Sequence, residues 1–235
     1  MREFLLTTVN GASLPNWTAG AHIALHLTSP TRGLVVRHYS LIGGDGLRDD
    51  PPNTYRIAVQ REEHGFGSNL IHETFKAGTT LRIGPPVNSF ALDREASKVL
   101  LLAGGIGITP LVPMARSLLR RKRAFQMVYS GRSVDQMAYA KNLQEMCGSV
   151  LSLQCSDTDG MLDIKGLPSS VTSGLPLYVP KCGIRPSTTV AMTSARPPKA
   201  ASGSPPPMLL ARVTRSGFTP SRCAFSRSVS GITAL

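Results

Sequence analysis

The chain has 235 residues, of which 41% are hydrophobic, and this length suits two modest domains. No stretch reaches the roughly 18 uninterrupted apolar residues of a membrane span, and no leader-like apolar segment follows the first residues, so we expect a cytoplasmic protein that contacts no membrane. The formal net charge is +12, but nine of the 26 Lys and Arg, and none of the 14 Asp and Glu, follow Asp163, so the charge belongs mostly to the C-terminal segment and does not indicate nucleic-acid binding.

Residues 1–92 are predicted to form a small antiparallel β-barrel. Four short segments alternate apolar and polar residues or are rich in β-branched and aromatic ones, and turn residues separate them: 21–27, 34–41, 55–61 and 80–83. Several strands at this spacing are typical of barrels. One helix is expected at about residues 68–75, where Leu70, Ile71 and Phe75 share a face.

Residues 93–179 are predicted to form a doubly wound α/β domain. The run 98–103 is continuously apolar, as in a parallel strand that is covered on both faces. After it, helices and strands alternate, with helices expected at 111–121 and 136–146 and strands at 125–129, 150–154 and 175–179. This alternation indicates a parallel sheet with helices packed against it.

Residues 180–235 show no sustained hydrophobic period and are rich in Pro, Ser, Arg, Ala and Thr. Such a segment cannot easily bury enough apolar surface to offset the entropy of ordering it, so we expect a mostly disordered basic tail. A nucleic-acid-binding role for this tail is disfavoured, because it lacks interleaved aromatic residues and any known module.

The cysteines also limit the chemistry. None of Cys147, Cys155, Cys182 and Cys223 forms a C-x2-C pair, and their spacing fits neither a zinc site nor an iron–sulfur site. A cytosolic protein of this size needs no disulfide. We therefore predict isolated thiols, no metal site and no [2Fe–2S] cluster within this chain.

The segment Arg37-His38-Tyr39-Ser40-Leu41 is the first pattern that indicates a ligand. A flavin needs an aromatic face for its ring, donors for its polar edge and a cation for its phosphate. Arg37, Tyr39 and Ser40 supply these groups, and strand alternation places Arg37 and Tyr39 on one face. Taken alone, the segment equally fits an ordinary strand with a packed tyrosine and an exposed arginine.

With two later segments, this pattern resembles the ferredoxin–NADP reductase superfamily, whose flavin motif is R-x-Y-S-L. His64-Gly65-Phe66-Gly67-Ser68-Asn69 is similar to its phosphate-binding turn, where backbone N–H groups and a serine hydroxyl at a helix N-terminus hold the flavin phosphate. Gly104-Gly105-Ile106-Gly107-Ile108-Thr109-Pro110 resembles its nicotinamide-domain signature, G-G-x-G-x-T-P. There the glycines permit a tight turn, Thr109 caps the next helix and Pro110 begins it, and the helix N-terminus faces the dinucleotide pyrophosphate.

Within this superfamily, residues 1–179 most resemble the reductases of phthalate dioxygenase and vanillate O-demethylase. The resemblance implies hydride transfer from NADH (alternatively NADPH) to FMN (alternatively FAD), and a terminal oxygenase or ferredoxin-type protein as electron acceptor. It implies no titrating catalytic side chain. The implied cofactor-binding residues are Arg37, Tyr39, Ser40, Leu41, Gly65, Gly67, Ser68, Asn69, Gly104, Gly105, Gly107, Thr109, Pro110 and Arg132, and Asn88, Ser89 and Phe90 are implied neighbours of the site.

The sequence departs from this family in three ways. We expect the family's earliest strand to be short or absent. Cys182 stands two positions later than the cysteine of a Cys-Gly-Pro segment expected directly after residue 179, and no ferredoxin motif follows. Either the reading frame shifts near residue 180 or the basic tail is genuine. The alternative function is therefore a flavin-binding scaffold without turnover, because the nicotinamide domain lacks its expected last helix.

Overall fold

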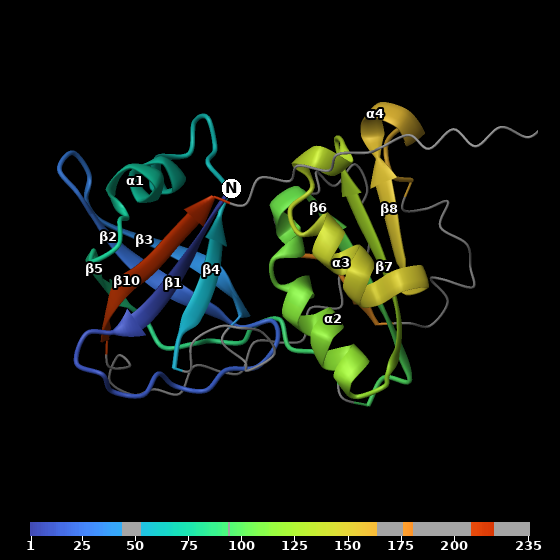
Figure 1. Cartoon of the computed structure of the whole chain (residues 1–235), viewed down its shortest axis with the longest axis horizontal. Helices are drawn as coiled ribbons and strands as arrows, with labels where there is room; N and C mark the ends of the chain where they lie inside the picture. Colours follow the sequence, from blue (N-terminus) through green and yellow to red (C-terminus); the bar gives the residue numbers. More distant parts are fainter. Residues whose placement is uncertain (44–52, 94, 164–175, 181–207, 219–235) are drawn as a thin grey trace, which may run out of the picture.

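The computed structural model describes residues 1–43, 53–93, 95–163, 176–180 and 208–218, which form two domains lying side by side (Figure 1). The first domain is a closed antiparallel barrel, and the second is a parallel sheet with helices packed against it. Both predicted architectures are confirmed. Among these residues, no helix is long and apolar enough to cross a membrane.

The barrel encloses the first hydrophobic core. Its strands and helix, in chain order, are β1 (Arg2–Thr8), β2 (His22–Ser29), β3 (Gly33–Gly43), β4 (Tyr55–Val59), α1 (Phe66–Thr74), β5 (Thr80–Ile83) and β10 (Leu209–Phe218). Around the barrel the strands follow the order β1-β10-β5-β2-β3-β4. Strand alternation determines what is buried: Ile23, Leu25 and Leu27 of β2 point into the core, whereas Ala24 and His26 between them are more exposed.

Strand β10 corrects the prediction of a disordered tail for part of that segment. Residues 209–218 pair with β1 on one side and β5 on the other and so close the barrel (red in Figure 1). Ala211 and Val213 are fully buried in the barrel core, and Leu209 packs against it. Pairing on both edges satisfies the backbone groups that would otherwise be left at an open seam. The tail predicted at 181–207 and 219–235 lies outside the described residues.

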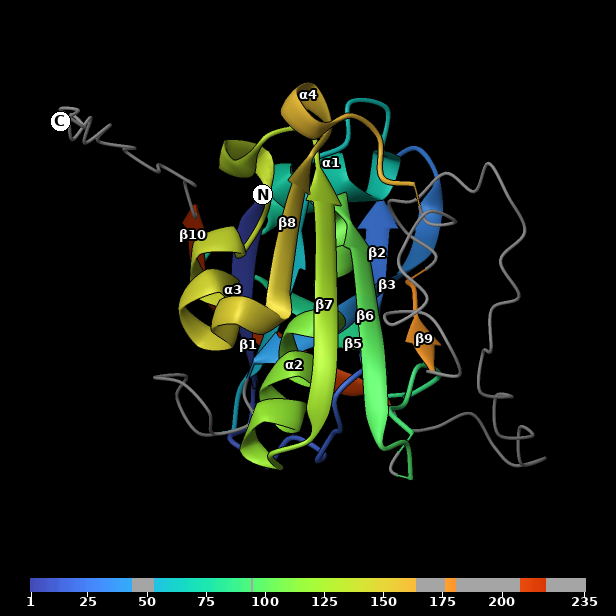
Figure 2. The same cartoon turned by 90° about the vertical axis from the view of Figure 1, so that its right-hand side faces the viewer.

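The second domain contains the predicted alternation of strands and helices. Its elements are β6 (Lys98–Gly104), the 3₁₀ turn η1 (Gly105–Ile108), α2 (Leu111–Arg120), β7 (Ala124–Gly131), η2 (Val134–Gln136), α3 (Ala140–Cys147), η3 (Gly148–Val150), β8 (Leu151–Cys155), α4 (Ser156–Asp159) and β9 (Leu177–Tyr178). The sheet order is β8-β7-β6-β9, and the pairs are parallel. Helices α2 and α3 cover one face of this sheet (Figure 2).

The continuously apolar run of β6 is explained by burial on both faces. Val99, Leu101 and Ala103 belong to the core that α2 and α3 cover. Leu100 and Leu102 point to the opposite face, where partly buried residues pack against them: Leu162, Leu177 and Val179. A parallel strand with two covered faces needs apolar residues at successive positions, as the sequence predicted.

Candidate functional site

The predicted flavin residues lie on β3. Arg37 is exposed and its Nη1 donates a hydrogen bond of 2.8 Å to the Val36 carbonyl, whereas Tyr39 is half-buried against the barrel core. Burial raises the pKa of Tyr39 to about 12, with nearby Arg37 opposing the rise, so the phenol is neutral at physiological pH. Leu41 is fully buried and Ser40 is partly buried. Strand β3 therefore presents an exposed cation beside a neutral aromatic ring.

The structure brings Arg37 and Gly67 into contact. A Cβ atom added at Gly67 would lie 2.9 Å from Cγ and 3.1 Å from Nε of Arg37, so a larger residue there would require the arginine stem to shift from the start of α1. Gly67 itself is buried, and Gly65 occupies the N-cap position. No side chain caps this helix, and its first turn contains no acidic residue. A helix N-terminus without a side-chain cap and a guanidinium thus meet at one place, which suits a phosphate group.

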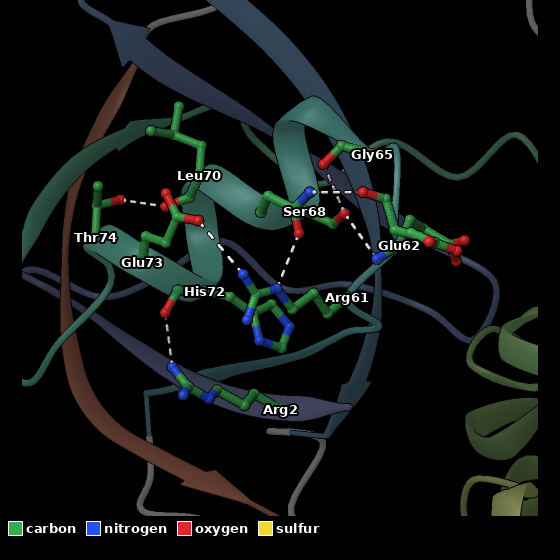
Figure 3. A network of polar contacts seen from close by, with 11 residues as sticks. Arg2, Arg61, Glu62, Gly65, Ser68, Leu70, His72, Glu73 and Thr74 are labelled. Carbon is green, nitrogen blue, oxygen red and sulfur yellow. Dashed lines mark hydrogen bonds and ion pairs between the residues drawn. The ribbon is translucent and has the colours of Figure 1, made fainter.

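Ser68 and Asn69 shape this turn from within. The Ser68 hydroxyl donates a hydrogen bond of 3.0 Å to the Gly65 carbonyl and accepts one of 3.1 Å from the Glu62 N–H (Figure 3). The Asn69 side chain accepts a hydrogen bond of 3.0 Å from Arg61. These bonds give both residues a structural role, and their contact with a phosphate stays a prediction.

A hollow adjoins the predicted phosphate-binding turn. It has a volume of about 330 Å³ and is lined by seven residues: Arg32, Glu63, His64, Phe66, Asn69, Leu70 and Glu73. Within it, the Arg32 guanidinium carbon lies 4.5 Å from the centre of the Phe66 ring. This stacking holds a second cation beside the start of α1.

The predicted dinucleotide-binding turn connects β6 to α2. Gly104 ends the buried strand, and Gly105 has a φ of +50°, a backbone conformation that favours glycine. Residues 105–108 form the 3₁₀ turn η1, and Gly107 is buried within it. The motif therefore produces the strand–turn–helix arrangement that its resemblance implied.

One predicted role in this turn is wrong. Thr109 does not cap α2, because its hydroxyl donates a hydrogen bond of 3.1 Å to the Ile106 carbonyl. The N-cap residue is Pro110, with no side-chain cap. The chain is already helical at Thr109, where φ is −56° and ψ is −46°, whereas a capping threonine needs an extended backbone. No side chain caps α2, and because Pro110 and Pro113 have no N–H, only Leu111 and Val112 have backbone donors at the start of this helix.

Sequence analysis overlooked Tyr129 of β7. Its ring is fully buried, and its hydroxyl donates a hydrogen bond of 3.1 Å to the Gly105 carbonyl. Tyr129 pairs with Ala103 in the parallel β6–β7 register, which brings the phenol beneath the glycine turn. The motif contains only the turn itself, so the signal for Tyr129 was its place on the neighbouring strand.

Replacing Tyr129 with phenylalanine is expected to loosen this turn. The lost hydrogen bond leaves the Gly105 carbonyl without that donor and should lower the free energy of unfolding by about 1 kcal/mol. If the turn binds the pyrophosphate, the KM for NADH should rise while flavin affinity stays the same. Steady-state kinetics and flavin fluorescence titration measure the two effects, and an unchanged KM would contradict a role in shaping the turn.

Arg132 follows β7 at the same carboxyl edge of the sheet as the glycine turn, since Gly104 pairs with Ser130. Its side chain is exposed, and its carbonyl accepts a hydrogen bond of 3.2 Å from the Asp157 N–H. The placement suits a ribose or phosphate contact, which stays a prediction. Cys182, the displaced cysteine, lies outside the described residues.

The predicted neighbouring segment, residues 88–90, joins the two domains. The Asn88 amide donates hydrogen bonds of 2.7 Å to the Thr18 hydroxyl and 3.0 Å to the Ala19 carbonyl. Phe90 packs against the core of the second domain and meets Tyr178 edge to face at 5.6 Å between ring centres. The two candidate binding regions are therefore held in one body.

Comparisons with known proteins agree with this geometry. Residues 101–158 match the family model described as oxidoreductase NAD-binding domain. The chain is 37% identical over 186 residues to the heme-dependent oxidative N-demethylase beta subunit of Ectopseudomonas mendocina, a match that covers 78% of this chain and 56% of the relative. It is 38% identical over 146 residues to the vanillate O-demethylase oxidoreductase of Acinetobacter baylyi, covering 62% of this chain and 43% of the relative.

A solved structure is similar to the chain in both sequence and fold. Phthalate dioxygenase reductase is 31% identical to the chain with a TM-score of 0.60, over 75% of this chain and 54% of that one. The chain spans about half the length of the curated relatives that it matches. These similarities confirm the predicted resemblance: the chain belongs to the ferredoxin–NADP reductase superfamily and is a homologue of the reductases of oxygenase and demethylase systems.

Proposed function

We propose that the chain is an NAD(P)H-dependent flavoprotein reductase that supplies electrons to an oxygenase system. The observation that carries this proposal is the contact between Arg37 and Gly67, which joins the flavin strand to an uncapped helix N-terminus. A bound flavin would accept a hydride from the nicotinamide and release the electrons one at a time.

The protein's own residues would bind the flavin and the dinucleotide and orient their rings. Arg37 and the first N–H groups of α1 would hold the flavin phosphate, and Tyr39 would pack against the ring. The turn from Gly104 to Pro110 would bind the dinucleotide pyrophosphate at the N-terminus of α2. No proton-transfer group is needed, since the contribution of the chain is to hold two rings in contact.

Within this proposal we favour FMN as the flavin and NADH as the reductant. Family resemblance supports FMN, with FAD as the alternative, and Arg37 and the start of α1 would hold its phosphate. Family resemblance supports NADH, with NADPH as the alternative. The acceptor would be a terminal oxygenase or a ferredoxin-type protein, in line with the systems to which the relatives belong.

A second candidate is a flavin-binding scaffold that does not turn over. The observation that favours it is strand β9, which within the described residues 176–180 has two residues and pairs with Leu100 and Leu101 of β6. A weak edge next to β6 would leave the dinucleotide turn less firmly supported.

An anaerobic titration distinguishes the two candidates. The full chain is loaded with FMN, and NADH is added while the visible flavin absorption is followed. Bleaching by stoichiometric NADH is the result expected of a reductase. A bound flavin that dithionite bleaches but NADH does not would overturn the reductase proposal and support the scaffold.

A further inference from the structure

A carboxylate on the barrel bonds to both domains at once. Glu3 of β1 accepts a hydrogen bond of 2.5 Å from Arg56 Nη1 on its Oε2 atom and one of 2.5 Å from the Tyr139 hydroxyl on its Oε1 atom. Arg56 belongs to the barrel, whereas Tyr139 directly precedes α3 of the second domain. The Glu3 and Arg56 side chains are only 17% and 25% exposed, so solvent weakens this group little.

The phenol of Tyr139 is a permanent donor in this group. Burial, and then the neighbouring Glu3 carboxylate, raise the pKa of Tyr139 well above its usual value. The hydroxyl therefore keeps its proton throughout the physiological range. A hydrogen bond from a neutral phenol to a charged, half-buried carboxylate is among the stronger kinds of side-chain contact.

The backbone of Tyr139 is also unusual. Its φ of +63° and ψ of +6° lie in the left-handed region, which bulky residues rarely adopt. The Tyr139 carbonyl nevertheless accepts the Leu143 N–H at 2.8 Å and so starts α3. A strained conformation persists only where surrounding contacts determine it, and here the conformation allows the side chain to bond across the domain boundary.

Other contacts between the two domains involve the candidate site directly. Arg116 of α2 donates a hydrogen bond of 3.0 Å to the Ile42 carbonyl at the end of the flavin strand. The Met114 side chain of α2 and the Phe90 carbonyl lie against Gly20, where an added Cβ would be 2.1 Å from the carbonyl oxygen and 2.8 Å from Met114 Cε. Helix α2 carries the dinucleotide turn at its start, and α3 packs beside it in the same core.

We propose that Glu3 and Tyr139 form a latch that fixes the nicotinamide domain against the barrel and so positions the dinucleotide turn relative to the flavin strand. Both are positioning residues, because neither lies on the flavin strand, the phosphate turn or the dinucleotide turn. The docking part of this proposal depends only on contacts in the chain, and its consequence for hydride transfer rests on the proposed function.

The first test measures docking without any cofactor. Trp17 is the only tryptophan and packs against the barrel core, while Cys147 is buried in the core of the second domain. Urea unfolding is followed by Trp17 fluorescence and by maleimide labelling of Cys147, read by mass spectrometry. In the wild type the two transitions should coincide, and in Tyr139→Phe they should separate, with Cys147 exposed at lower urea concentration.

The second test measures, by stopped flow, the rate at which NADH bleaches the flavin in the FMN-loaded chain. Tyr139→Phe and Glu3→Gln should each reduce the first-order bleaching rate at saturating NADH by about tenfold, with FMN affinity unchanged, because misplaced cofactors react slowly. The matched control is Tyr55→Phe, which removes a hydroxyl that bonds to the Pro15 carbonyl at 2.6 Å within the barrel.

The latch proposal would be overturned if the Trp17 and Cys147 unfolding transitions coincide in Tyr139→Phe. It would also be overturned if these two transitions separate equally in Tyr55→Phe. If the wild type is not bleached by NADH, the reductase function fails, and the cofactor-free measurement still decides whether the latch exists. If the domains separate in Tyr139→Phe but the bleaching rate is unchanged, the positioning role is wrong.

Discussion

Replacing Val213 with aspartate is expected to destabilise the barrel by more than about 3 kcal/mol, because a charged carboxylate would replace a fully buried side chain. Val213 lies on β10, inside the core that this strand closes. Its backbone also pairs with the Thr79 carbonyl at 2.8 Å, so it has no alternative orientation without loss of the strand. Urea unfolding followed by Trp17 fluorescence measures the loss.

The matched control is Leu210→Asp on the same strand. Leu210 is 49% exposed on the outer surface, so the same substituent should change the free energy of unfolding by less than about 1 kcal/mol. If both variants are as stable as the wild type, residues 209–218 do not close the barrel. The tail would then be the dispensable segment that its composition indicated.

Strand β10 also shows where sequence analysis fails. Leu209, Ala211 and Val213 do alternate with more exposed residues, which is the pattern of a half-buried strand. The pattern is short, however, and it stands in a Pro- and Ser-rich segment. Its partner β1 begins at residue 2, and no local property of either segment specifies a pairing over that separation.

The second domain was more predictable because its signals are local. A continuously apolar strand, a glycine-rich turn and a helix follow one another within 23 residues, from Lys98 to Arg120. The structure contains the strand, the turn and the helix in that order. Details that depend on backbone conformation were not accessible in the same way. A threonine before a proline resembles a helix cap, and the hydroxyl bond of Thr109 to the Ile106 carbonyl, together with its helical φ and ψ, excludes that role.

Contacts between the domains were beyond prediction for a different reason. Glu3 and Tyr139 are 136 positions apart and belong to no motif. The Arg37–Gly67 contact is intermediate, since both residues were selected by motif but only the structure brings them together. Sequence therefore predicts the separate halves of the site, and tertiary packing decides how they meet.

Replacing Arg37 with methionine is expected to weaken FMN binding by about 10- to 100-fold. Methionine keeps an apolar stem over Gly67 but lacks the guanidinium, and a hydrogen bond to a charged group contributes about 1.5–3 kcal/mol. Riboflavin, which has the same ring and no phosphate, should bind the variant and the wild type equally. Quenching of flavin fluorescence gives both dissociation constants.

Two further variants test whether the loss of FMN affinity comes specifically from Arg37 in its contact with Gly67. Arg82→Met removes an exposed arginine from β5, which β2 separates from β3 in the barrel, and should leave FMN affinity unchanged. Gly67→Ala places a methyl group 2.9 Å from Cγ of Arg37, so it should displace the arginine and reproduce the loss of FMN affinity while sparing riboflavin. If Arg37→Met weakens FMN and riboflavin equally, Arg37 supports the ring or the fold, and the phosphate is held by the N–H groups of α1 alone.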